Sequence, residues 1–337
     1  ENITVDKSLT LSSNIDSASY TLSGTLTIEA NQDLDIRMIG GSFNAVTINS
    51  GTASETNKCK IVFVGSQFGG NLNSPTGVDL NMLYCNLPNT AVTFRFGKLI
   101  GCNLNYCVLQ QEDGAYNSDT CWVVANEFGG GCSFNFSDYN LCIANNNFTG
   151  WYVTITGSNL IGTNVIVNNE FFTSTNTSYG NNLKFQSNTD YSNTIVVNNK
   201  FTHSYQSSSV SYTHNVGTTT ASGFTAVNAP YFAYNNFTCN CSYNNSGYLG
   251  VYNLSPTPDN NFYGYSSIPH IDKGHPAIEY YDIDLTLNDI GIYGGPYTWD
   301  NYYDNNTSGN ARIYLLDMPF ELFQGQTPTI KAEGVHE

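Results

Sequence analysis

Short apolar runs of three to five residues alternate with polar turns along most of the chain. The runs at 60–64, 122–125, 153–155, 165–167 and 194–197 are rich in β-branched and aromatic residues, and clusters of Asn and Gly separate them. No window places apolar residues at the i, i+3, i+4, i+7 spacing of an amphipathic helix. The pattern therefore predicts a chain built almost wholly of short β-strands.

The strands recur with a fixed internal register. Each apolar run ends at a small polar residue, and a large apolar residue, the anchor, follows two positions later. The nine anchors are Phe43, Phe68, Leu87, Leu104, Phe128, Phe148, Phe171, Phe201 and Phe237. Successive anchors lie 17 to 25 residues apart as far as Phe171 and 30 and 36 apart after it. Such a repeat is expected of stacked coils with loop insertions on one side.

The small residue before each anchor predicts how the coils stack. Five consecutive coils carry asparagine there: Asn126, Asn146, Asn169, Asn199 and Asn235. An inward asparagine can bond the turn of its own coil and the asparagine of the next, which satisfies groups that would otherwise be buried unpaired. The sequence thus predicts an all-β, right-handed parallel β-helix with an asparagine ladder. Cys85 and Cys102 fill the same position in earlier coils, so we expect them to be neighbours.

The coil pattern stops near residue 256. We expect residues 1–255 to form the helix, with strands within 3–11 and 20–28 that start it and cover its open end. Residues 256–300, rich in Pro, Gly and Asp, are expected to be a closing loop segment. Residues 301–337 hold two strand-like runs, and we expect a short C-terminal β cap or appendage that could pair with another chain by strand addition.

Composition narrows the partners. The 337 residues include 27 acidic and 11 basic side chains, a net charge of −16, which argues against nucleic-acid binding. No apolar run is long enough to span a membrane. A chain that begins at Glu1 fits a mature secreted protein. The nine cysteines lack CxxC pairs, so we expect mostly buried thiols, with one or two disulfides as the alternative, and no zinc site.

Two phrases near the C-terminus carry a family resemblance. The stretch 271–276 reads IDKGHP, and 282–296 reads DIDLTLNDIGIYGGP. They resemble the terminal signature I-D-x-G-x-P, D-x-D-G-x-x-N-D-x-G-A-Y-G-G-P of right-handed parallel β-helix repeat proteins secreted by Bacteroidota. Leu285 and Ile292 stand where that family usually has Gly and Ala. The resemblance implies a secreted, extracellular or cell-surface protein, and it marks an architecture rather than an activity.

The second phrase also offers oxygen ligands at alternating positions. Asp282, Asp284, Asn288 and Asp289 are the residue types that hold Ca²⁺, although the EF-hand pattern is not met. The same residues commonly cap tight turns by accepting backbone N–H bonds. Calcium is thus the one cofactor that the sequence suggests.

Catalysis on an acidic polysaccharide needs a base and cationic partners. The sequence predicts no arginine beside a lysine and an acidic cluster in adjacent coils, and its five histidines are dispersed. Glu127 and Glu170, on neighbouring coils in this interpretation, are a carboxylate pair that hydrolysis could use, or else solvated turn residues. We predict no catalytic residue from the sequence.

A surface rich in Asn, Thr, Ser and Tyr suits contact with sugars, because rings stack on them and amides bond hydroxyls. We therefore predict a non-catalytic, secreted or cell-surface protein with a structural or adhesive role, glycan contacts and self-association into filaments. A polysaccharide lyase or glycoside hydrolase is the alternative. A phage tailspike or fibre is the second alternative, although no trimerisation segment is recognisable.

Overall fold

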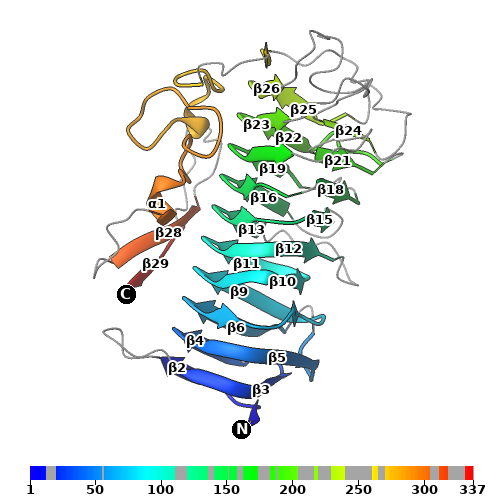
Figure 1. Ribbon diagram of the computed structural model, residues 1–337, viewed down its shortest axis with the longest axis vertical. Helices are drawn as coiled ribbons and strands as arrows, with labels where there is room; N and C mark the ends of the chain where they lie inside the picture. Colours follow the sequence, from blue (N-terminus) through cyan, green and yellow to red (C-terminus); the bar gives the residue numbers. More distant parts are fainter. Residues whose placement is uncertain are drawn as a thin grey trace, which may run out of the picture.

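The computed structural model shows a parallel β-helix, which confirms the predicted fold class (Figure 1). The structure describes residues 1–12, 20–54, 57–110, 120–135, 140–150, 152–157, 162–173, 183–186, 189–203, 216–218, 229–239, 260–264, 270–303, 311–317 and 331–336. The coils stack along the long axis of the molecule, with the N-terminus at one end.

Two parallel sheets form the walls of the helix. Sheet A has 17 strands: β1 (Ile3–Val5), β3 (Thr21–Ala30), β5 (Ser42–Ser50), β7 (Gln67–Phe68), β8 (Leu72–Asn73), β10 (Asn86–Phe94), β12 (Asn103–Leu109), β14 (Glu127–Phe128), β15 (Cys132–Asn135), β17 (Asn147–Phe148), β18 (Val153–Thr156), β20 (Glu170–Thr173), β21 (Leu183–Phe185), β23 (Lys200–His203), β24 (Val216–Thr218), β26 (Asn236–Cys239) and β27 (Phe262–Gly264). Sheet B has 10 strands: β2 (Leu9–Ser12), β4 (Asp35–Ile39), β6 (Cys59–Val64), β9 (Val78–Leu83), β11 (Phe96–Ile100), β13 (Thr120–Val124), β16 (Asn140–Ala144), β19 (Asn164–Val167), β22 (Thr194–Val197) and β25 (Tyr231–Ala233).

Each middle coil has three sides. The chain runs through sheet B, bends, and then passes through sheet A twice, as in β13, β14 and β15. A glycine turn at 129–131 separates the last two strands. In the earlier coils a single long strand, such as β10 or β12, continues through both of these passes. The two sides of the coil that these passes form therefore belong to one sheet, sheet A.

The bend between the two sheets has one backbone conformation throughout. In ten coils the residue just before the ladder position has φ between 50° and 71°; these residues are Gly40, Gly65, Tyr84, Gly101, Ala125, Asn145, Asn168, Asn198, Tyr234 and Asn260. Gly and Asn tolerate this left-handed region better than other residues. This explains why seven of the ten positions carry one of the two.

Inside the bend, the five predicted asparagines stack as a ladder. Each Nδ2 donates to the Oδ1 of the next coil's asparagine at 2.9–3.0 Å, and Asn261 adds a sixth member. Next to the ladder, the rings of the anchors Phe128, Phe148, Phe171, Phe201 and Phe237 stack with centroids 4.8–5.0 Å apart. The apolar interior is therefore continuous from coil to coil.

The cysteines are part of this interior. The seven described cysteine side chains are buried free thiols. Cys85 and Cys102 are neighbours as predicted, since the Cys85 amide donates to the Cys102 Sγ at 3.4 Å. Burial raises the pKa of the Cys85, Cys107 and Cys132 thiols.

The N-terminal strands begin the helix. Ile3, Leu9 and Leu11 pair in register with the buried Leu26, Ile36 and Met38, and they are 42%, 40% and 39% exposed. That these strands cover the open end stays a prediction.

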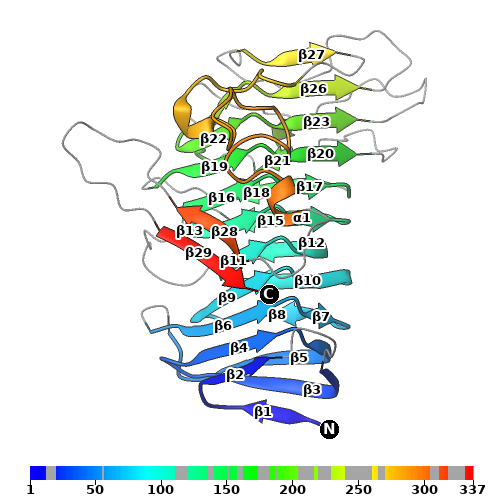
Figure 2. The ribbon, with the colours of Figure 1, turned by 90° about the vertical axis from the view of Figure 1, so that its left-hand side faces the viewer.

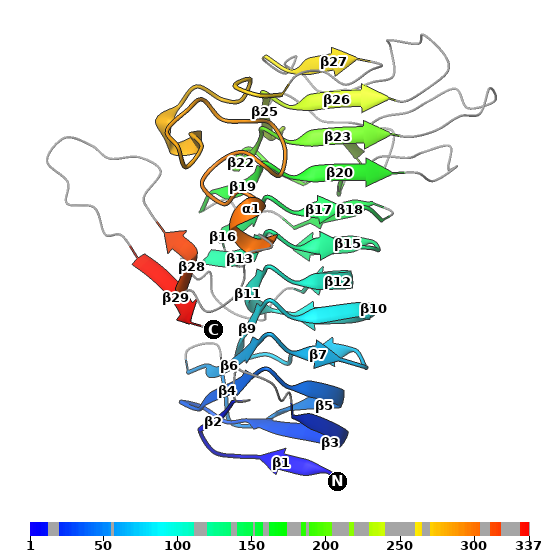
Figure 3. The same ribbon diagram turned by 60° about the vertical axis from the view of Figure 1, so that its left-hand side comes forward.

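The helix extends further, and the segment after it lies elsewhere, than the sequence predicted. β27 adds a rung beyond residue 255 by pairing in parallel with β26. Residues 270–303, the closing segment, contain a 3₁₀ turn η2 (Ile278–Tyr280) and α1 (Asp300–Tyr303). The closing segment lies along the side of the helix against sheet B rather than across its end (Figures 1 and 3).

The C-terminal appendage is an antiparallel pair, β28 (Ala311–Asp317) and β29 (Lys331–His336). It lies beside the same side of the helix (Figure 2). Among the described residues, no helix has the length and apolarity to cross a bilayer.

Candidate functional site

Three outward asparagines at the bends hold the closing segment. Asn145 donates to the Ile292 and Gly294 carbonyls at 2.9 and 2.6 Å. Asn168 donates to the Asp289 carbonyl at 2.7 Å. These residues precede the ladder asparagines, so each Asn-Asn pair has one side chain inside the coil and one outside.

The third of these asparagines is Asn198. It accepts the backbone N–H of His275 at 2.7 Å through Oδ1 and that of Gly291 at 2.9 Å through its carbonyl. The closing segment is thus bonded to three successive coils.

Apolar contacts complete this attachment. The outer face of sheet B carries Trp122, Val124, Cys142, Ala144 and their neighbours, and Tyr280, Tyr297 and Tyr302 of the closing segment bury it. The Trp122 and Tyr297 rings meet edge to face at 6.0 Å. The His275 ring lies 4.9 Å from the rings of Tyr234 and Tyr280, and burial lowers its pKa.

The predicted calcium ligands lie in this segment and mostly bond its own backbone. Asp282 accepts the N–H groups of Asp289 and Gly295, and burial raises its pKa to about 6 against these hydrogen bonds. Asp284 accepts from Thr286, and Asp289 from the Asp272 N–H at 2.8 Å.

Asn288, the fourth predicted ligand, is fully buried. It bonds the Tyr280 carbonyl and exchanges hydrogen bonds with the Asn168 side chain. The described residues hold no group of three or more His, Cys, Asp or Glu side chains that could bind a metal. Asp282, Asp284 and Asp289 thus accept backbone N–H groups of turns, Asn288 joins the segment to Asn168, and calcium stays a prediction.

The backbone at Leu285 is in the left-handed region. Leu285 has φ of 66° and its side chain is exposed. Glycine adopts this conformation without strain, so leucine is the less favoured residue here.

The carboxylate pair proposed from the sequence is corrected by the register. Asn147 lies between Glu127 and Glu170, so these two residues are two rungs apart and not on neighbouring coils. Glu170 instead pairs with Lys200 at 2.6 Å on the next rung. The structure therefore does not bring Glu127 and Glu170 together as a catalytic pair.

The outer face of sheet B between β4 and β11 carries a different set of charged residues. Asp35, Lys60 and Asp79 are register partners on three successive strands, and Phe96 follows them. The next outward column contains Arg37, Val62, Asn81 and Lys98. We call Asp35, Arg37, Lys58, Lys60, Asp79, Asn81 and Lys98 the polar face.

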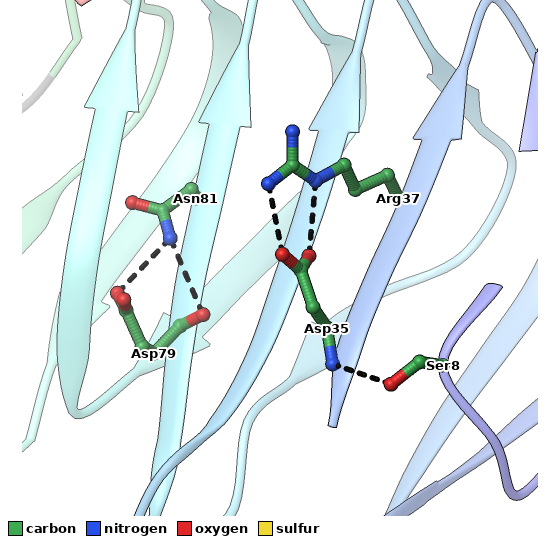
Figure 4. A network of polar contacts seen from close by, with 5 residues as sticks. All are labelled: Ser8, Asp35, Arg37, Asp79 and Asn81. Carbon is green, nitrogen blue, oxygen red and sulfur yellow. Dashed lines mark hydrogen bonds and ion pairs between the residues drawn. The ribbon is translucent and has the colours of Figure 1, made fainter. Parts of the chain in front are cut away.

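Short hydrogen bonds organise the polar face (Figure 4). The Asp35 carboxylate accepts two bonds from the Arg37 guanidinium at 3.0 and 2.8 Å, and the Asp35 amide donates to Ser8 Oγ at 3.1 Å. Asn81 Nδ2 donates to the Asp79 carboxylate at 3.0 Å. Lys58 Nζ lies 3.5 Å from the centroid of the Phe96 ring, a cation–π contact.

The two carboxylates have different electrostatic surroundings. The hydrogen bond from Arg37 lowers the pKa of Asp35. Burial raises the pKa of Asp79, although the bond from Asn81 and the charges of Lys60, Lys98 and Lys58 oppose this rise. The charges of three ammonium groups thus act on one partly buried carboxylate.

This face corrects the expectation that no arginine lies beside a lysine and acidic residues in adjacent coils. The sequence spacing between these charged residues and the anchors would have revealed this face. Asp35, Lys60 and Asp79 each lie eight residues before an anchor, and Arg37, Asn81 and Lys98 each lie six before one. Equal offsets place residues in one outward column.

A second surface feature lies at the corner between the two passes of sheet A. Cys107, Cys132 and Val153 are register partners, so the residues before them, Tyr106, Gly131 and Tyr152, share a column. Tyr106 and Tyr152 are 43% and 42% exposed. Their rungs are about 9.6 Å apart, two strand spacings.

Glycines pack closely around these rings. A Cβ at Gly130 would come within 2.5 Å of Tyr106 Cε1 and 2.6 Å of the Asn105 carbonyl oxygen, so this position favours glycine. Gly130, Gly150 and Tyr152 lie together with Phe148 and Phe172 at this corner. Lys184 Nζ lies 3.7 Å from the centroid of the Tyr152 ring.

Comparison with family models, with curated proteins and with solved structures returned no match to this chain.

Proposed function

We propose that this protein is a non-catalytic β-helix rod that binds an extracellular polysaccharide at the column of Tyr106 and Tyr152. The observation that carries the proposal is the pair of exposed rings in one column with a glycine between them. A pyranose ring stacks its C–H face on a tyrosine, and both rings are exposed enough to receive one. A ligand that meets both rings has to be an oligosaccharide.

A secreted or cell-surface location and self-association remain part of the proposal. The resemblance of 271–296 to a secreted family supports the location. The exposed core-facing side chains of the first rung support end-to-end contacts. Electron microscopy of the purified chain distinguishes single rods from filaments.

The binding proposal is tested with a double variant. Wild type is screened by affinity electrophoresis against neutral polysaccharides, and the ligand found is titrated by calorimetry. We expect Tyr106→Ala/Tyr152→Ala to weaken binding by about tenfold, because each truncation removes a stacking surface. Tyr231→Ala, an equally exposed tyrosine on sheet B, serves as the control and should bind as wild type. Unchanged binding by the double variant, or no ligand in the panel, contradicts the proposal.

A glycan-cleaving enzyme is the second candidate, and the polar face is the observation that favours it. Two carboxylates and several cations on adjacent rungs are what an enzyme acting on uronates needs. Under the leading proposal we expect no new unsaturated or reducing ends after incubation with acidic polysaccharides. Release of such ends by wild type, and its loss in Asp79→Asn, would establish the enzyme instead.

A further inference from the structure

Lys184 brings a positive charge to the column of Tyr106 and Tyr152. It lies on β21 as the register partner of Thr154, and its side chain reaches back to the Tyr152 ring on the neighbouring rung. Among the described residues, its ammonium group has this ring contact and neither an ion pair nor a hydrogen bond. An ammonium group carries three N–H donors, so donors remain for a ligand.

The surroundings of Lys184 favour the binding of an anion. The residue is half-buried, and burial lowers the pKa of its ammonium group with no described carboxylate to oppose the shift. A partly desolvated cation without a counter-ion gains more from an anionic ligand than a fully hydrated one does. The cation–π contact with Tyr152 offsets only part of the lost hydration.

The strands around this lysine carry no other charge. The second pass through sheet A runs along β8, β15, β18, β21, β24 and the later parts of β10 and β12. Lys184 is the single charged residue of these strands, although the chain as a whole carries a net charge of −16. Charges further away than about 8 Å are largely screened at physiological salt. On these strands, therefore, the fixed charge that an anion meets is positive.

The lysine leaves the tyrosine rings accessible. Tyr152 is 42% exposed with the ammonium contact in place, and Tyr106 is 43% exposed. A hydrogen bond from an ammonium group to a carboxylate is about 2.8 Å long, so the bound oxygen would lie within about 6.5 Å of the Tyr152 ring centroid. One sugar unit can therefore stack on this ring and place its own carboxylate at Lys184.

We propose that the tyrosine column binds an acidic polysaccharide in preference to a neutral one, with the Lys184 ammonium group holding the carboxylate of a sugar unit that stacks on Tyr152. Ser133 and Thr154 share the column of Lys184 and supply hydroxyl groups beside it. This inference rests on the function proposed above and adds the charge of the ligand to it.

The test compares three neutral polysaccharides, dextran, pullulan and hydroxyethyl cellulose, with the carboxymethylated form of each backbone, by calorimetry at about 0.15 M salt. We expect wild type to bind the carboxymethylated member of a pair about tenfold more tightly than the neutral one. Lys184→Gln should lose this preference and bind the neutral member as wild type does. Lys184→Arg, which keeps the charge, and Lys273→Gln, which removes an exposed charge from the closing segment, should both retain it.

The outcomes distinguish this inference from the function proposed above. If wild type binds both members of each pair equally and Tyr106→Ala/Tyr152→Ala weakens both, only the charge preference fails. If the double variant binds as wild type does, or wild type binds none of the six polysaccharides, both proposals fail. An equal loss of both members in Lys184→Gln, or loss of the preference in Lys273→Gln, overturns the inference. So does equally tight binding of poly-L-glutamate, which carries carboxylates without sugar rings.

Discussion

Replacing Phe171 with alanine is expected to lower the free energy of unfolding by about 4 kcal/mol. Phe171 is buried between the rings of Phe148 and Phe201, with centroids 4.9 and 4.8 Å away. The truncation removes both ring contacts and leaves a cavity in the middle of the stack. Urea unfolding followed by circular dichroism measures the change.

Phe171→Leu is the matched control for this prediction. Leu87 and Leu104 fill the anchor position in earlier coils, so a leucine fits the site without a backbone change. We expect a loss of only about 1.5 kcal/mol from it. Equal losses from both variants would contradict this prediction, because leucine keeps most of the buried apolar volume that alanine removes.

Replacing Asn169 with alanine is expected to cost about 4 kcal/mol, by a different mechanism. Asn169 Oδ1 accepts the Asn146 N–H at 2.9 Å, and its Nδ2 donates to the Ile143 carbonyl at 2.8 Å and to Asn199 Oδ1 at 2.9 Å. Alanine leaves several of these buried groups without a partner. The same urea titration measures the loss.

Two variants separate this effect from a general response to substitution. Asn169→Ser should lose about half as much, because a serine hydroxyl can bond its own coil, as Ser66 bonds the Val64 carbonyl at 3.2 Å. Asn147 directly follows the ladder residue Asn146 and is on the outward face. Asn147→Ala should therefore change the free energy of unfolding by less than about 0.5 kcal/mol. If Asn147→Ala were as destabilising as Asn169→Ala, the ladder would have no special role.

The interior of the helix was predictable from sequence because it depends on local spacing. A small residue followed two positions later by Phe or Leu defines one bend, and nine such segments define the stack. Asn126, Asn146 and Asn169 lie in the ladder for that reason. The parallel register follows, since a slip of one residue would turn every anchor toward solvent.

The outer surface was predicted less well because its contacts join distant segments. Asn145 and Gly294 are 149 residues apart, and no local pattern indicates that they meet. In the pairs 145–146, 168–169 and 198–199, the sequence alone does not distinguish the first asparagine from the second. The positive φ of the first asparagine turns its side chain outward. The charged columns of sheet B were visible in the offsets from the anchors, but composition alone suggested that cations were too scarce to gather.

The bonds from Asn145, Asn168 and Asn198 have a mechanical consequence. In a stacked-repeat protein each rung touches only its immediate neighbours, so local fraying can spread from either end. The closing segment is bonded to three consecutive rungs and couples them directly. None of these three rungs can open without breaking its hydrogen bonds to that segment. The middle of the rod should therefore resist stretching as one cooperative block, while the rungs before it yield one at a time.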